Sequence, residues 1–120
     1  MYDHVGLRVK DLDASVRFYS AVLAELGYVL ASRDASGAAL GPKGAPALWL
    51  AVDEGQHTPV HVAFSAKTRA AVDAFHSAGL KAKGRDNGAP GRREDYSPTY
   101  YAAFLIDPEG NNVEAVCHQG

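Results

Sequence analysis

The sequence is poor in cysteine, with Cys117 as the only one in 120 residues. A single cysteine cannot form an intrachain disulfide, which excludes the small disulfide-stapled folds. No apolar run approaches the roughly 20 residues of a membrane-spanning helix, and no signal-peptide pattern opens the chain. We therefore expect a soluble protein of the cytoplasm in which Cys117, which alternates onto an apolar strand face, is a buried and unreactive thiol.

The sequence also lacks an excess of either charge. Lysine and arginine number 12 against 14 aspartates and glutamates, for a net charge of −2. No basic patch indicates nucleic acid or a membrane surface as a partner, and no acidic tail indicates a basic protein. Hydrophobic residues make up 47% of the chain, which is enough for one domain over residues 1–120 with a core that needs no structural metal.

The end of the sequence carries a carboxylate in an apolar setting. Two apolar runs flank Asp107-Pro108-Glu109-Gly110, a tight-turn sequence, and predict a β-hairpin. Glu114 lies between Val113 and Ala115 in its second strand. A buried carboxylate is costly unless a cation, a hydrogen-bond donor or water satisfies it. Glu114 is therefore the first candidate for a functional residue.

Apolar periodicity predicts the same order of elements in each half of the chain. Strands are expected at 3–9, 28–33, 38–40 and 47–52, with a helix between Asp11 and Gly27. In the second half we expect a strand at 59–64, a helix that begins at Ser65 or Thr68 and ends at Gly79, a weak strand at 80–83, a polar loop at 84–98 and the hairpin. Two βαβββ modules, about 1–55 and 56–120, are the economical interpretation, and they give an α+β fold.

A histidine heads each module, His4 in the first and His61 in the second. Strand alternation places both on the face opposite the helix, and Glu114 follows the same logic. If the two first strands lie side by side, the three residues converge in one cleft. Two imidazoles and a carboxylate suit a divalent transition metal with open positions for substrate. The alternative is that both histidines are hydrogen-bonded structural residues.

The remaining histidines carry no such symmetry. They are His57 in a turn-like segment, His76 on the flank of the second helix and His118 near the end of the sequence. We expect all three to be solvated surface residues.

With these residues identified, the chain resembles the vicinal oxygen chelate superfamily, which includes glyoxalase I, fosfomycin-resistance transferases, extradiol dioxygenases and bleomycin-resistance binders. The resemblance rests on three stretches: Asp3-His4-Val5-x-Leu7-x-Val9-x-Asp11-Leu12-x-x-Ser15-x-x-Phe18-Tyr19, His61-Val62-Ala63-Phe64 and Asp107-Pro108-Glu109-Gly110-Asn111-Asn112-Val113-Glu114. It implies a cupped mixed sheet around one cavity with the helices outside, and a homodimer. His4, His61 and Glu114 match the three metal-ligand positions, for Mn, Fe, Ni, Co or Zn.

The sequence departs from the best-known members at two positions. Trp49 stands where glyoxalase I has a fourth ligand, a glutamate that also moves the proton. Phe104 stands where fosfomycin-resistance enzymes and extradiol dioxygenases have a tyrosine. Arg8, in contrast, matches a glyoxalase I arginine that contacts a substrate carboxylate. No catalytic base can be named from the sequence.

The leading hypothesis is a metal-dependent enzyme of the lyase or isomerase class, in which the ion is a Lewis acid for a small-molecule substrate. Trp49, Phe104 and Tyr100 would form apolar pocket walls. Arg8, with Arg92 or Arg93, would hold an anionic end of the substrate. The 84–98 loop is either a lid or a plain surface loop. The alternatives are a metal-free, drug-sequestering binder of the bleomycin-resistance type, an Fe(II) dioxygenase and a thiol transferase.

Overall fold

The structure, a computed structural model, describes residues 1–120 and consists of two helices and two four-stranded sheets. The elements are β1 (Val5–Val9), α1 (Leu12–Ala24), β2 (Val29–Arg33), β3 (Gly37–Gly41), β4 (Leu48–Val52), β5 (His61–Ser65), α2 (Arg69–Lys81), β6 (Arg85–Arg92), β7 (Tyr101–Ile106) and β8 (Asn112–Cys117). This order is βαβββ twice, so the predicted α+β fold of two tandem modules is confirmed.

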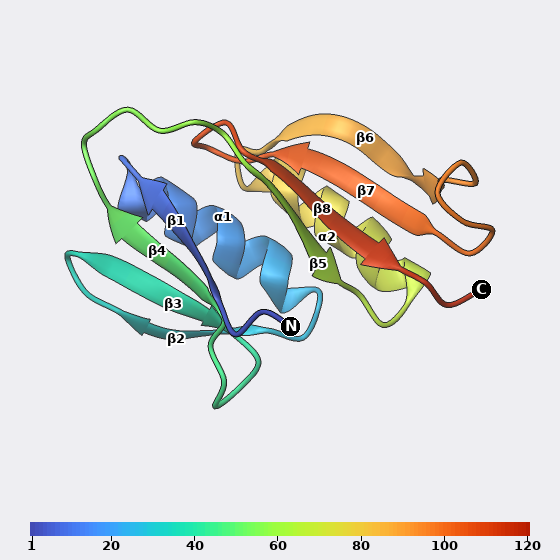
Figure 1. The fold of residues 1–120 in the computed structure, drawn as a ribbon, viewed down its shortest axis with the longest axis horizontal. Coiled ribbons are helices and arrows are strands. Elements are labelled where there is room, and N and C mark those ends of the chain that lie inside the picture. The colour runs from blue at the N-terminus through green and yellow to red at the C-terminus, as the bar shows by residue number, and fades with distance from the viewer.

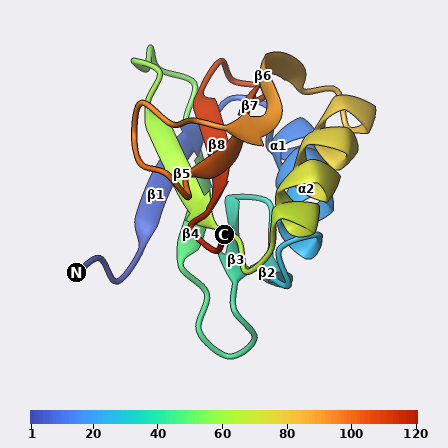
Figure 2. The same cartoon turned by 90° about the vertical axis from the view of Figure 1, so that its right-hand side faces the viewer.

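Both sheets are mixed and share one topology. Their strand orders are β1-β4-β3-β2 and β5-β8-β7-β6, with the first pair parallel and the other pairs antiparallel in each. The two sheets lie next to each other in Figure 1, and Figure 2 shows both helices on one side of them. The opposite side of each sheet has no helix over it. We call this side the open face.

The first helix follows the sequence pattern closely. Asp11 is the N-cap, and its carboxylate accepts a hydrogen bond of 3.0 Å from the Ala14 amide. The helix ends at Ala24, and the chain turns at Gly27, whose φ of +88° is a conformation that suits glycine. Neither helix, each 13 residues in length, is long and apolar enough to cross a membrane.

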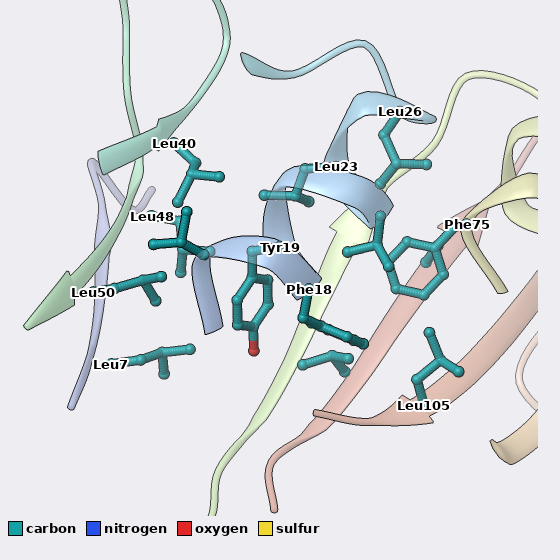
Figure 3. Close-up of a cluster of buried hydrophobic side chains, with 14 of the residues drawn as sticks. Leu7, Phe18, Tyr19, Leu23, Leu26, Leu40, Leu48, Leu50, Phe75 and Leu105 are labelled. Carbon is teal, nitrogen blue, oxygen red and sulfur yellow. The ribbon is translucent and has the colours of Figure 1, made fainter. Parts of the chain in front are cut away.

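The helix α1 lies between the two halves of the core. Figure 3 shows Leu40, Leu48 and Leu50 on one side of it, and Phe75 and Leu105 on the other. All are almost fully buried, and burial of each such side chain contributes about 1.5–3 kcal/mol. Because one module alone would bury little apolar surface, this shared cluster holds the modules together.

The second helix does not end at Gly79, as the sequence suggested, but continues to Lys81. A Cβ on Gly79 would lie 2.2 Å from Cδ1 of Leu105 and 3.1 Å from Cγ1 of Val22. Glycine here permits close packing between helix and sheet and does not stop the helix. The predicted strand at 80–83 is therefore wrong, and the chain turns instead at Lys83, whose φ is +75°.

The predicted loop at 84–98 is also wrong over its first half, because β6 occupies it and pairs with β7. The sequence pattern indicated a loop because Gly88, Pro90 and Gly91 are rare inside strands. They are tolerated here because β6 is an edge strand with an irregular register. His76, expected in solvent, is buried and pairs with Asp86 across 2.8 Å. The pair joins α2 to β6, so most of this segment is part of the sheet and is not a lid.

A buried carboxylate, Asp107, links the two modules. It accepts hydrogen bonds from the Tyr19 hydroxyl of α1, from the amides of Glu109 and Asn111, and from the Asn111 side chain. Burial and the neighbouring Asp107 raise the pKa of Tyr19 well above its usual value, so the phenol keeps the proton that it donates. Two further links join the modules, from the Asp11 amide to Glu109 and from the Tyr28 hydroxyl to the Ser65 carbonyl.

Replacement of Tyr19 by phenylalanine should lower the free energy of unfolding by about 1.5–3 kcal/mol, since the donor serves a buried charged acceptor. Tyr28→Phe is the matched control and should lose only about 0.5–1.5 kcal/mol, because its acceptor is an uncharged carbonyl. Urea unfolding of both variants measures the difference. Equal losses in the two variants would contradict the role given to Asp107.

Candidate functional site

Glu114 lies on the open face of the second sheet, between Ala63 of β5 and Phe104 of β7. It is only 2% exposed, because neighbouring side chains cover it. Its Oε1 lies 3.0 Å from Nε2 of His61, and its Oε2 accepts a hydrogen bond from the Tyr100 hydroxyl. The carboxylate that drew attention in the sequence thus has two partners, one of them the predicted ligand His61.

The ring of His61 is oriented by the backbone. Its Nδ1 lies 3.1 Å from the Asn112 carbonyl. A carbonyl can only accept, so Nδ1 carries a proton, and in the neutral ring Nε2 has the lone pair. This lone pair faces the Glu114 carboxylate. The two groups attract each other when a proton lies between them, on Nε2 or on Oε1, or when both bind one metal ion.

His4 has the same local arrangement at a different place. Its Nδ1 lies 2.7 Å from the carboxylate of Asp3, which leaves Nε2 as the free nitrogen. The ring packs edge-on against Trp49 of β4, with centroids 6.2 Å apart. Trp49 is 43% exposed, on the open face of the first sheet. Both predicted histidine ligands therefore have an Nδ1 held by an oxygen, as is usual for metal-binding histidines.

The structure does not bring the three predicted ligands together within one chain. The strand β1 pairs with β4, and β5 pairs with β8, rather than β1 with β5. No three side chains of histidine, cysteine, aspartate or glutamate form a group that could hold a metal ion. One chain therefore supplies His61 and Glu114 at one place and His4 at another, and the three-ligand set stays a prediction.

Tyr100 was expected to be an apolar wall, but its hydroxyl contacts Glu114. Its ring packs against Tyr96 and His118, with centroids 4.9 and 5.3 Å away. Burial, then the hydrogen bond to Glu114, raises the pKa of Tyr100 to about 12. No spacing in the sequence indicates this contact, because Tyr100 precedes β7 and meets β8 only through the hairpin.

The three predicted anion-binding arginines lie in different places. Arg8 bonds to Asp53 across 2.6 Å, and Arg92 pairs with Glu94 across 3.0 Å. The Gly55 amide and then Arg8 lower the pKa of Asp53, so this carboxylate stays charged beside Arg8. Arg93 instead lies over the ring of Phe104. Of the three, Arg93 is the one that contacts Phe104, the ring that stacks on His61.

An apolar cavity of about 370 Å³ lies where the two sheets meet. Its lining includes His4 and Tyr28 from the first module and Phe64 from the second. It does not include His61 or Glu114. The His61–Glu114 pair therefore lies outside this apolar hollow.

Comparisons with known proteins agree with the fold. The family model described as "Glyoxalase/Bleomycin resistance protein/Dioxygenase superfamily" matches residues 2–115. Among curated proteins, none matches the chain.

Among solved structures, a glyoxalase/bleomycin resistance protein from Albidiferax ferrireducens T118 is 30% identical, with a TM-score of 0.85 over 98% of each chain. A glyoxalase/bleomycin resistance protein/dioxygenase family enzyme from Burkholderia phytofirmans PsJN is 20% identical, with a TM-score of 0.75 over 98% of each chain. A lactoylglutathione lyase from Agrobacterium tumefaciens is 21% identical, with a TM-score of 0.69 over 95% of this chain and 90% of that one. The last two show the fold alone.

The Tyr100–Glu114 hydrogen bond should give the protein a characteristic alkaline pH dependence. Because folding raises the pKa of Tyr100 from 10.0 to about 12, the bond stabilises the protein fully below pH 10 and is lost as the pH rises through 12. The stability difference between wild type and Tyr100→Phe should be constant from pH 7 to 9 and shrink above pH 10. Urea unfolding across this range measures it, and a difference that does not change up to pH 11 would contradict the contact.

Proposed function

Since the chain belongs to the glyoxalase/bleomycin resistance protein/dioxygenase superfamily, we propose that it is a divalent-metal-dependent enzyme for a small molecule with neighbouring oxygen atoms, of the lyase or isomerase class. The observation that carries the proposal is the His61–Glu114 pair. Its imidazole and carboxylate face each other across 3.0 Å with a proton already held on the far ring nitrogen. This arrangement suits a metal ion as well as a proton.

In this proposal His61 Nε2 and Glu114 Oε1 hold the ion. The Tyr100 hydroxyl donates a hydrogen bond to Oε2 of Glu114. This bond fixes the orientation of the carboxylate and leaves Oε1 for the ion. When bound, the ion supplies Lewis-acid chemistry that polarises the substrate oxygens. The Phe104 ring stacks on His61 and places an apolar surface beside the pair. Mn, Fe, Ni, Co and Zn all accept these donors.

The third ligand, His4, would come from a second copy of the chain. The supporting observations are its free Nε2, its separation from the pair within one chain, and the exposed Trp49 beside it. An exposed tryptophan on an open sheet face is typical of a protein contact. We therefore propose a homodimer in which each open face covers the other. Its compartment would be the cytoplasm, which suits the reduced and buried Cys117.

A metal-free binding protein is the second candidate. The apolar cavity of about 370 Å³ between the modules supports it, since such a cavity could hold a small apolar ligand without any metal. In that case His4 and His61 would be ordinary structural residues. Metal binding separates the two candidates.

Protein purified without a histidine tag should bind Mn, Co, Ni or Zn and gain thermal stability. His61→Ala and Glu114→Gln should weaken binding by more than tenfold, since even the loss of a residue that only supports a ligand costs about 10–100-fold. His57→Ala is the matched control, because His57 pairs with Asp53 away from the site. The measurements are metal analysis and calorimetric titration. Equal metal binding by all four proteins would remove the enzyme proposal.

A mixing experiment tests the contribution of a second copy. His4→Ala and His61→Ala should each bind metal poorly alone. Mixed dimers, made by coexpression, should regain part of the binding, because one chain supplies His61 and the other supplies His4. If each site lay within one chain, the coexpressed protein would bind no better than the two variants alone.

A further inference from the structure

Arg93 completes a row of flat groups on the open face of the second sheet. Its guanidinium carbon lies 5.4 Å from the centre of the Phe104 ring. The Phe104 ring also stacks on the His61 ring, with centroids 6.2 Å apart and planes 22° from parallel. A cationic fork, an apolar ring and the His61–Glu114 pair are therefore neighbours on one surface.

Two glycines of β6 leave the space that Arg93 occupies. A Cβ on Gly91 would lie 3.1 Å from Nη1 of Arg93. A Cβ on Gly88 would lie 3.0 Å from Phe104 and 3.4 Å from Nη2 of Arg93. Side chains at these positions would displace the guanidinium or the ring. The glycines of this edge strand therefore leave room for the Arg93 guanidinium beside Phe104.

Arg93 has no carboxylate partner, whereas Arg8 and Arg92 each have one. Its Nη2 donates to the Ala89 carbonyl at 2.7 Å, which orients the guanidinium without neutralising its charge. An arginine has five N–H donors, so most of the fork stays available. A planar fork with a free positive charge matches a carboxylate through two parallel hydrogen bonds.

We infer that Arg93 binds a carboxylate group of the ligand beside the His61–Glu114 pair, so the substrate is a small carboxylic acid. This inference rests on the proposed function for the other end of the ligand, where the chelating oxygens would bind the ion that His61 and Glu114 hold. Phe104 lies between the two polar ends and offers an apolar surface to the middle of the ligand. A ligand with an aromatic or short aliphatic segment between its carboxylate and its chelating oxygens fits this order.

The test uses the full chain treated with a chelator, with benzoate as probe and benzamide as its uncharged match. NMR titration should show benzoate binding at least tenfold more tightly than benzamide to the wild type. Arg93→Gln should abolish this preference, while Arg93→Lys should keep part of it, because lysine keeps the charge and loses the fork. Arg92→Gln is the control and should behave as wild type. Equal binding of both probes, or an unchanged preference in Arg93→Gln, would overturn the inference.

The outcome is separable from that of the proposed metal site. Benzoate preference in a protein that binds no metal would support the Arg93 site and remove the enzyme proposal. Metal binding without a preference for benzoate would support the metal site and remove the Arg93 inference. The unfolding midpoint of Arg93→Gln should match wild type, since the guanidinium lies on the surface of the sheet.

Discussion

The hydrogen bonds of Asp107 are the constraint on which the rest of the structure depends. This buried carboxylate holds Asn111 through its amide and its side chain, and Asn111 in turn accepts from the Val60 amide across 3.0 Å. The starts of β5 and β8 are thereby fixed together, and His61 pairs with Asn112 in register. That register places His61 and Glu114 on the same face of adjacent strands. Tyr19 attaches the whole arrangement to the first module, so a helix of one module supports the polar site of the other.

Much of the fold could be predicted because local and long-range preferences agree. Asp11 caps α1 and its apolar stripe faces the core, so the helix is visible in the sequence. The duplicated order of elements follows from the same kind of pattern. Two predictions failed where a glycine had a second use. Gly79 lies inside α2 and permits close packing of this helix against Leu105, although glycine more often marks a helix end. Gly88 and Gly91 lie in an edge strand, although such residues more often indicate a loop.

The candidate site could be predicted only in part. Alternation was sufficient to place Glu114 and His61 on one face, because both lie in regular strands. It could not show that His4 would lie apart from them, since that depends on how the two sheets meet. The contact of Tyr100 with Glu114 and the position of Arg93 over Phe104 depend on the path of the chain between β6 and β7. Such contacts join residues with no fixed spacing, and they become visible only in three dimensions.

The chain between β6 and β7 has a property that bears on how the protein could change. The Arg93 amide donates to the Tyr100 carbonyl at 2.7 Å, so these residues continue the ladder of the two strands. Arg93, which we propose to bind a carboxylate, and Tyr100, which donates to Glu114, are thereby paired at the base of a surface loop, residues 94–99. Because this pairing is made by the backbone, insertions or deletions within that loop would leave it in place. The loop can therefore vary in length and composition while the backbone of Arg93 and Tyr100 stays paired.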